Sequence, residues 1–557
     1  MALDMTPEQK AIGQANFHRA VGKLAEAPAP AGDGMNRRQF MQGLVAAGAI
    51  APVSAAAYFG YTNSGFATRP VKAGLIGAGD EGGVLIGEHN PAYVEFIAYS
   101  DIRPSNQKRI FTMEPPPSPR RGFNFHYGND ARNRIRLYEN YKELLANPDI
   151  EMVVIALPLH LHAQVSIEAM QAGKHVLCEK LMAWNITQCK RMIREQQKLR
   201  DEGKDILLAI GHQRHYSMLY AHAVEVMNSG VLGDIRHIRA LWHRNNSLPR
   251  LTDNGQTQTD RETGRIVLRD SWRPEIKPDD RTALESSIRR HGYKSMSELV
   301  RWRLYTRTGG GLMAELGSHQ LDACSIFLGK TREHHVYPIA VSASGGKHFY
   351  QDDREVEDHV YCTYEFPGKN YNPQEPIRDA QGNLKYNDVV TVTYSSINTN
   401  GFEPYGECVM GNKGTLVLEG EQSAMLWGGA GRSTAVTVST PGGRPALDSG
   451  ASMDAPGERR AQGAGQGSLG HGPVSRGYRE EMEHFAYLIR MRHEGMDRDR
   501  SKLEPRCDGR AAMDDAIMAL TANQAMRQGR RIEFDRRWFD PASDEVPDGN
   551  MREEIIT

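Results

Sequence analysis

The sequence predicts an α/β protein with two main domains, the first built on a parallel sheet and the second on a large, mostly antiparallel, open sheet. From Val71 onward, short apolar runs alternate with helix-length segments, which is typical of parallel strands joined by crossover helices. After about residue 213 the strand-like runs become longer and alternate in polarity, which favours an antiparallel sheet with one covered face. The 557 residues divide into a leader and linker, the two domains, and a tail: 1–68, 69–213, 214–537 and 538–557.

The first strand of the parallel sheet leads into a glycine motif, Gly77-x-Gly79-x-x-Gly82. The first glycine allows a tight turn, the second lets the backbone approach a diphosphate, and the third lets the next helix pack closely. The amino end of that helix then favours an anion. We therefore predict a dinucleotide-binding loop rather than a plain strand–turn–helix. Asp80 and Glu81 lie within the loop, and we expect their side chains to point to solvent.

The second strand, Val94–Ser100, ends in Asp101, about 20 residues after the glycine motif. A carboxylate at this place holds the ribose hydroxyls and repels a 2′-phosphate. The predicted cofactor is therefore NAD. Arg103 keeps NADP as the alternative, and Ile102 is assigned to the same ribose-binding edge.

Later strands bring a possible catalytic group to the same edge. The run Cys178-Glu179-Lys180 closes a predicted parallel strand, at the end where open α/β sheets bind ligands. Partial burial and a positively charged nicotinamide would both lower the lysine pKa toward a useful acid–base value. The alternative is a surface lysine that merely caps the strand. The insert Glu114–Asn133 is expected to be a surface loop.

A second candidate segment follows the glycine triplet that starts at Gly309. If it is helical, Glu315, His319 and Asp322 fall at positions i, i+4 and i+7 and share one face. A base with carboxylates beside it suits removal of a hydroxyl proton while a hydride leaves the same carbon. An ordinary solvated helix face is the equally weighted alternative.

The second domain contains five strand-like runs and two further features. Residues 440–476 are rich in glycine and are expected to form a flexible loop, and a helix near Arg510–Gln528 is expected to return to the first domain. The strand-like runs are Ile235–Trp242, Val336–Ala343, His359–Phe366, Val389–Ser395 and Gly414–Leu418.

Composition argues against several classes of partner. Lysine plus arginine number 68 and aspartate plus glutamate 69, so no basic field favours nucleic acid. The six cysteines show no metal-ligand spacing, and we predict no metal site. No run approaches the ~20 apolar residues of a stable membrane span.

The amino-terminal region resembles an export signal. Asn36–Met41 contains the twin arginines followed by phenylalanine, and an apolar stretch, Gly43–Ala57, comes next and ends in small residues. The alternative is a surface helix with two adjacent arginines. We expect export by the twin-arginine route, to the periplasm or otherwise out of the cytoplasm, with the nucleotide already bound. Whether the signal is cleaved stays open, because the segment before Arg37 is long.

Over roughly residues 70–535 these motifs resemble the glucose–fructose oxidoreductase/inositol dehydrogenase (Gfo/Idh/MocA) superfamily. The resemblance rests on the glycine motif, Ala156-Leu157-Pro158 with His162, the run Ala172–Lys180, and Gly309–Asp322. It implies a Rossmann domain followed by an α/β domain whose open sheet forms a homodimer or homotetramer. It also implies NAD(P) chemistry on a carbohydrate or polyol.

The resemblance carries functional residues over by position. Lys180 matches a lysine that aligns the substrate hydroxyl and His319 matches the general base, while Glu315 stands where the family usually has aspartate and Leu181 replaces a proline. Arg214 is assigned to substrate, with an interdomain salt bridge as the alternative. The catalytic residues are thus Lys180, His319 and Glu315, and the substrate-binding residues are Lys180, Arg214, Glu315, His319 and Asp322. The cofactor-binding residues are Gly77, Gly79, Asp80, Glu81, Gly82, Asp101, Ile102, Pro158, His162, Glu179 and Lys180.

Three functions fit this sequence. The first is an NAD(P)-dependent oxidoreductase that moves a hydride between nicotinamide and a sugar, polyol or sugar derivative, with a tightly bound, recycled cofactor. The second is an NAD-dependent glycosidase, similar to N-acetylgalactosaminidases of the superfamily, that works by transient oxidation and elimination. A non-catalytic NAD-binding sensor is the third.

Overall fold

The computed structural model of the chain describes most of the two domains and parts of the amino-terminal region. The described residues are 5–26, 55–61, 69–112, 114, 118–259, 264–330, 336–374, 377–378, 381–382, 384–428, 475–494 and 503–547.

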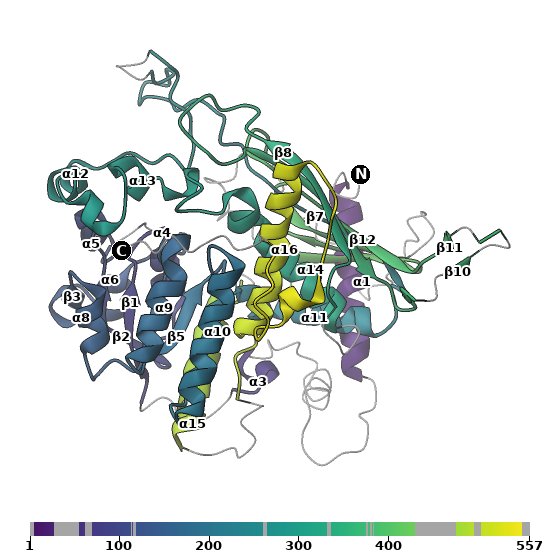
Figure 1. Cartoon of the computed structure of the whole chain (residues 1–557), viewed down its shortest axis with the longest axis horizontal. Coiled ribbons are helices and arrows are strands. Elements are labelled where there is room, and N and C mark those ends of the chain that lie inside the picture. Colours follow the sequence, from purple (N-terminus) through teal and green to yellow (C-terminus); the bar gives the residue numbers. More distant parts are fainter. Residues whose placement is uncertain are drawn as a thin grey trace, which may run out of the picture.

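The first domain is built on a six-stranded parallel sheet with the strand order β3-β2-β1-β4-β5-β6. Figure 1 labels β1, β2, β3 and β5 of this sheet. The order reverses beside β1, and ligands of open α/β sheets bind outside the carboxyl ends of the strands at such a point. This confirms the predicted Rossmann-type domain. The strands are β1 Val71–Ile76, β2 Val94–Ser100, β3 Arg136–Tyr138, β4 Met152–Ile155, β5 His175–Glu179 and β6 Leu208–Gly211. The helices between them include α4 Asp80–Glu88, α5 Pro104–Arg109, α8 Tyr141–Ala146, α9 His162–Gln171 and α10 Ile186–Asp201.

The second domain is built on an eight-stranded sheet with the order β15-β14-β13-β7-β12-β9-β8-β16. All neighbours are antiparallel except β7 and β12, which are parallel, so the predicted mostly antiparallel sheet is confirmed. Alternate residues of β12 are buried, because one face packs on helices. The strands are β7 Ile235–His243, β8 Ala340–Gly346, β9 His359–Pro367, β12 Val389–Ile397, β13 Tyr405–Gly411, β14 Gly414–Glu419, β15 Ser423–Gly428 and β16 Ile532–Glu533. Helices α11 Met218–Asn228 and α14 Ser318–Lys330 pack beside this sheet, and the small strands β10 Ile377–Arg378 and β11 Leu384–Tyr386 form a separate hairpin.

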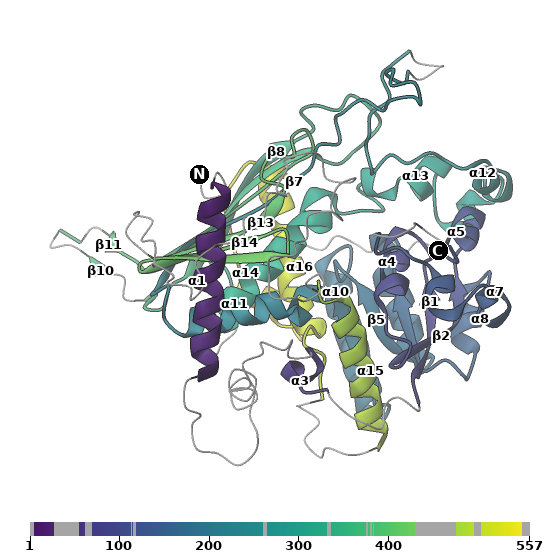
Figure 2. The same cartoon turned by 180° about the vertical axis from the view of Figure 1, so that it is seen from behind.

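Two carboxy-terminal helices return to the first domain. The predicted one, α16 Gly509–Gln528, packs against α10 and also against β8 of the second sheet. The sequence did not predict α15 Tyr478–Glu494, which buries Met482 and Phe485 among the core residues of the first domain. Part of the segment 214–537, predicted as the second domain, thus packs on the first domain, because α15 lies beside β1, β2 and α4 (Figure 2).

The segment predicted to be an irregular tail is docked rather than loose where it is described. Residues Arg536–Phe539 form a short 3-10 helix. The ammonium of Lys190 on α10 donates to the carbonyl oxygens of Arg537, Ser543 and Glu545.

The amino-terminal region, predicted as leader and linker, contains a packed helix. Helix α1 Pro7–Glu26 lies across β15 at the end of the second sheet (Figure 2). Phe17 is buried there, and the Lys10 ammonium lies 2.7 Å from the Glu419 carboxylate. The twin-arginine motif lies outside the described residues, as do 440–474 and most of the apolar stretch. Among the described helices, none has the length and apolar character needed to cross a membrane.

The insert Glu114–Asn133 is more than the expected surface loop. It forms the short helix α6 Phe123–Tyr127, and the Phe123 ring is fully buried between Phe96, Tyr99 and Phe111. The insert therefore completes the core of the first domain, because a large aromatic ring is stabilised by such burial.

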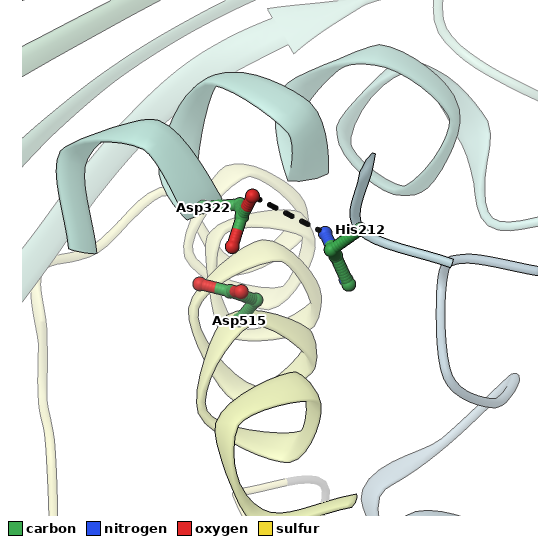
Figure 3. A group of neighbouring side chains, drawn as sticks. All are labelled: His212, Asp322 and Asp515. Atoms are coloured by element: carbon green, nitrogen blue, oxygen red, sulfur yellow. Dashed lines mark ion pairs between the residues drawn. The ribbon is translucent and has the colours of Figure 1, made fainter. Parts of the chain in front are cut away.

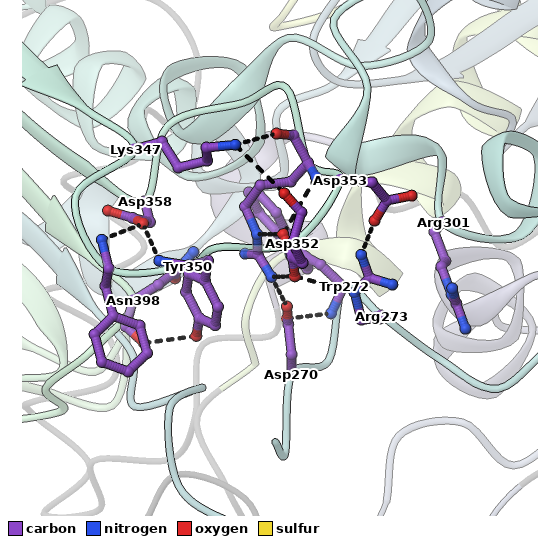
Figure 4. Close-up of polar contacts among 12 residues, drawn as sticks. Asp270, Trp272, Arg273, Arg301, Lys347, Tyr350, Asp352, Asp353, Asp358 and Asn398 are labelled. Atoms are coloured by element: carbon purple, nitrogen blue, oxygen red, sulfur yellow. Dashed lines mark hydrogen bonds and ion pairs between the residues drawn. The ribbon is translucent and has the colours of Figure 1, made fainter. Parts of the chain in front are cut away.

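A long connection from β7 to α14 spans the space between the domains. It includes α12 Pro278–Leu284 and α13 Met296–Val300. At the far end, the Asp280 carboxylate accepts hydrogen bonds from Arg103 and Ser105 of the first domain. At the near end, Asp270 accepts from Arg354, whose guanidinium also pairs with Asp352. Figure 4 labels the two carboxylates, Asp270 and Asp352.

Candidate active site

A cavity of about 2660 Å³ lies between the domains, under the connection from β7 to α14. The glycine loop and Asp101 line it on the side of the first domain. Trp242 and His319 line it on the side of the second domain, and Lys180 also contributes to its wall. The cavity is thus formed at the carboxyl ends of the parallel strands, where the strand order predicts a ligand.

The three motif glycines have different environments. Gly77 has a φ of +99°, and a Cβ atom there would lie 2.3 Å from the Ala156 carbonyl oxygen. A Cβ atom at Gly82 would lie 2.2 Å from the Gly77 carbonyl oxygen, whereas one at Gly79 would meet nothing within 4 Å. The fold itself therefore requires the first and third glycines. The second borders open cavity, as close approach of a ligand to the backbone requires.

Asp101 is fixed at the end of β2 by three hydrogen bonds. Its carboxylate accepts from the backbone nitrogens of Ala78 and Arg103, each at 2.8 Å, and from the Asn106 side chain at 3.0 Å. Burial raises the pKa of Asp101, and these donors oppose that rise. The carboxylate lies on the cavity wall beside Ile102, as a ribose-binding residue should.

The two acidic residues of the loop differ from each other. Asp80 has an exposed carboxylate 2.8 Å from the Arg109 guanidinium, in line with the expected direction to solvent. Burial opposes ionisation of Asp80, but the charges of Arg109 and Arg120 outweigh it and lower the pKa. For Glu81 the expectation is wrong, because its Oε1 is buried without a hydrogen-bond partner among the described residues.

We expect the variant Asp101→Ser to bind NAD at least about 10-fold more weakly and to improve NADP relative to NAD, because charge-assisted hydrogen bonds to the ribose are lost and repulsion of a 2′-phosphate is relieved. Equilibrium titration with each nucleotide measures both effects. Asp80→Ser removes a carboxylate of the same loop and is the matched control. An unchanged preference between the nucleotides in Asp101→Ser would contradict the ribose assignment.

Lys180 extends from the end of β5 to the other candidate segment. Its ammonium donates to the Glu315 carbonyl oxygen at 2.8 Å. Burial lowers the pKa of Lys180, although the charges of Glu315 and Glu179 oppose this. Burial and the Glu81 charge raise the pKa of Glu179 well above its usual value. The peptide bond between Lys180 and Leu181, where the family motif has proline, is cis.

His319 faces the cavity from the start of α14. Its ring lies 5.2 Å from the Trp242 ring, and the side chain is 8 % exposed. Burial lowers the pKa of His319 well below its usual value, and the charges of Lys180 and Arg214 lower it further. The imidazole is therefore neutral at neutral pH, which is the form a general base requires.

Glu315 and Asp322 do not act with His319 as one carboxylate–base face. Glu315 lies in a turn of π-helix, Met313–Gly317, and its carboxylate pairs with Arg303 at 2.8 Å. Asp322 does not line the cavity; it is buried, and its carboxylate accepts from His215 at 2.7 Å. The expected substrate contact of Asp322 is thus wrong, because the residue faces the junction of α14 with the first domain.

Asp322 belongs to a buried cluster with His212 and Asp515 (Figure 3). The Nδ1 atom of His212 lies 3.7 Å from the Asp322 carboxylate, and one possible ligand atom from each residue lies within 4.8 Å of the others. Burial raises the pKa of Asp322 to about 7, and burial with the Asp322 charge raises that of Asp515 well above its usual value. The sequence predicted no metal site and gave no signal for this cluster, whose members are far apart in the chain.

The variant Asp515→Asn is expected to flatten the pH dependence of stability. Between pH 3.8 and about 7 the folded protein holds protons that the unfolded chain releases, so these groups make the free energy of unfolding fall as pH rises. Urea unfolding at several pH values from 5 to 8 measures the slope. A wild-type slope that persists unchanged in Asp515→Asn would show that protonation of the Asp322–Asp515 pair does not cause the pH dependence.

Arg214 and His162 take positions that differ from the sequence assignments. The Arg214 guanidinium is 1 % exposed and pairs with Glu407 at 3.0 Å and Glu421 at 2.8 Å. It also donates to the His319 carbonyl oxygen, so the salt-bridge alternative is what the structure shows.

His162 is buried, and its ring nitrogens lie at the carbonyl oxygens of Leu157 and Leu181. It therefore joins two loops and does not line the cavity, whereas Pro158 does line it.

Several cavity residues were missed from the sequence. Trp242 and Tyr405 stack with ring centroids 4.7 Å apart, and Arg244 lies over the Trp242 ring. The only sequence signal was an aromatic residue and an arginine two apart at the end of a predicted strand, where both side chains leave on one face. Arg303 and Tyr405 offered no such signal, because long-range packing places them.

Comparison with known proteins agrees with this fold and cavity. Residues 71–201 match the oxidoreductase family with the NAD-binding Rossmann fold (Gfo/Idh/MocA), and residues 282–417 match the Gfo/Idh/MocA C-terminal domain. An uncharacterized oxidoreductase of Rhizobium meliloti is 37% identical over 116 residues, which are 21% of this chain and 33% of that protein. Inositol 2-dehydrogenase of Salmonella paratyphi B is 30% identical over 112 residues, 20% of this chain and 32% of that protein.

The chain therefore spans about a third of the length of these two curated relatives. An NAD-binding protein from Listeria innocua has a similar fold, with 15% identity, a TM-score of 0.50, and coverage of 87% of this chain and 100% of that one. The fold and the glycine loop thus define an NAD(P)-binding protein. Two regions of the chain are thus similar to the two domains of the Gfo/Idh/MocA oxidoreductase family, the first of them an NAD-binding Rossmann domain.

Proposed function

We propose that this protein transfers a hydride between nicotinamide and a carbinol carbon of a sugar, polyol or sugar derivative. The observation that carries the proposal is that one cavity is lined by Lys180 and the glycine loop of the first domain and by a neutral His319 of the second. The inositol dehydrogenase relative supports a polyhydroxylated substrate.

The residues that fit NAD are those of the glycine loop together with Asp101, and the open space at Gly79 leaves room for a diphosphate. Bound NAD would supply the acceptor for the hydride that leaves the carbon. The His319 imidazole takes the hydroxyl proton as the C–H bond breaks, and the Lys180 ammonium donates a hydrogen bond to the oxygen. The Arg214 guanidinium donates to the His319 carbonyl oxygen and so holds the backbone of His319 in place. The ion pair of Arg303 with Glu315 fixes the residue whose carbonyl oxygen accepts the hydrogen bond from Lys180.

The test begins with denaturing the purified protein and measuring released NAD(H), because tight binding is part of the proposal. Free sugars and polyols are then screened for a change in nicotinamide absorbance, beside aryl glycosides screened for phenol release. Net NADH from a sugar supports the oxidoreductase. Phenol release without net NADH would instead establish the glycosidase, and neither activity with bound NAD would favour a sensor.

We also propose export by the twin-arginine route and a homodimer or homotetramer formed through the open face of the second sheet. The motif Asn36–Met41 supports export, and Tyr361, 48% exposed on β9, supports an unburied sheet face. Replacing Arg37 and Arg38 by lysine should keep the protein in the cytoplasm. Mass measurement in solution should give two or four copies, and a monomer would refute the assembly.

A further inference from the structure

Arg244, in the cavity wall of the second domain, has no role in the proposed hydride and proton transfer. Arg244 follows β7, lines the cavity and is partly buried. Its guanidinium carbon lies 5.2 Å from the centre of the Trp242 ring, which is also the ring packed against His319. Arg244 is therefore next to the proposed general base.

The neighbouring charges in this wall are already paired. Three carboxylates line the cavity here: Glu315 pairs with Arg303, Glu421 with Arg214, and Glu403 with Arg239. Within the described part of the chain, the Arg244 guanidinium has neither an ion-pair nor a hydrogen-bond partner; only its backbone nitrogen donates, to Ile397. A partly buried guanidinium with five unused donors can give hydrogen bonds to a ligand in the cavity.

The positive charge persists at neutral pH. Burial lowers the pKa of Arg244 to about 10, and the Arg303 guanidinium contributes to that decrease. A planar guanidinium that faces a cavity is suited to a carboxylate, which it binds through two parallel hydrogen bonds. One uncompensated charge matches a monoanion better than a phosphate dianion.

We propose that Arg244 forms a subsite for a carboxylate of the substrate, which makes the substrate a sugar acid such as a uronic or aldonic acid. The inference rests on the proposed function for the hydroxyl chemistry, but the subsite itself is defined by Arg244 and Trp242. Binding of the cofactor phosphates does not account for the unpaired charge of Arg244, because the proposed phosphate site is the glycine loop of the first domain.

The test compares three acids with their neutral counterparts: D-glucuronate with D-glucose, D-galacturonate with D-galactose, and D-gluconate with D-glucitol. D-glucose 6-phosphate is the phosphate probe. Binding to the NAD-loaded protein is followed by tryptophan fluorescence, because Trp242 lies in the subsite. Nicotinamide absorbance is followed separately in the same samples.

At least one acid is expected to bind wild type at least about 10-fold more tightly than its neutral counterpart. Arg244→Gln should weaken that acid about 10- to 100-fold and leave the neutral sugar and NAD within about twofold. The affinity of Arg244→Lys for the acid should lie between those of wild type and Arg244→Gln, because lysine keeps the charge but cannot form two parallel hydrogen bonds. Arg269→Gln removes an exposed arginine of the same cavity and should change nothing.

The subsite is overturned if wild type binds every neutral sugar more tightly than its acid. It is also overturned if Arg244→Gln keeps full affinity for the acid. Tighter binding of D-glucose 6-phosphate than of any acid overturns the carboxylate assignment, and an equal loss of NAD affinity places Arg244 at the cofactor. Acid binding through Arg244 without NADH formation refutes the oxidoreductase alone. NADH formed only from neutral sugars refutes the subsite alone.

Discussion

Replacing His319 by asparagine is expected to lower turnover about 10³-fold while NAD affinity stays within about twofold, because positioned acid–base groups contribute about 10²- to 10⁴-fold. The imidazole lies on the cavity wall, and burial holds its pKa well below the usual value, so the wild-type protein carries this side chain in the neutral form that the proposed base requires. Steady-state rates with the best sugar from the screen and a nucleotide titration measure the two quantities.

His291→Asn is the matched control for this variant, because His291 is an exposed histidine of the same cavity. Its turnover should equal wild type. The pH profile is a second readout: the acid limb of wild-type turnover should lie below the ordinary histidine range, since burial lowers the His319 pKa. Full turnover in His319→Asn would remove this residue from the mechanism.

Replacing Gly79 by valine is expected to weaken NAD binding at least about 100-fold without unfolding the protein, because the side chain would occupy the place of the diphosphate. Gly79 has a φ of −76°, which any residue adopts, and its missing Cβ faces open space. Thermal unfolding and nucleotide titration of the same sample separate stability from binding.

Gly82→Ala provides the contrast, because its Cβ would lie 2.2 Å from the Gly77 carbonyl oxygen. We expect this variant to lose about 1–3 kcal/mol or more of unfolding free energy, as overpacked sites do. If Gly79→Val lost stability and kept NAD, the assignment of the loop would be wrong.

The first domain was predictable from sequence because its information is local. A buried strand, three glycines and an acidic residue at the next strand end occupy one short stretch, and each has a backbone or charge requirement that can be stated in advance. The same holds for Lys180, whose place at a strand end follows from the strand pattern alone.

The parts that could not be predicted depend on long-range packing. Helical spacing put Asp322 beside His319, but the side chains of His215 and Asp515, distant in the chain, give Asp322 different neighbours. Arg214 is buried because Glu407 and Glu421 of the second sheet reach it. Neither set of partners is visible in a local motif.

The amino-terminal segment shows the same limit. The sequence predicts a leader and linker over 1–68, and within this region Phe17 of α1 is buried against the second sheet. That surface comes from β15 and α11, both far from α1 in the chain.

The central claim is that the dinucleotide spans this cavity from the glycine loop to Lys180 and His319. A crystal structure of the NAD-loaded protein tests it most directly. The claim predicts diphosphate density at the amino end of α4 and a nicotinamide ring beside the Lys180 ammonium. Nucleotide density elsewhere, or a nicotinamide turned away from both residues, would contradict it.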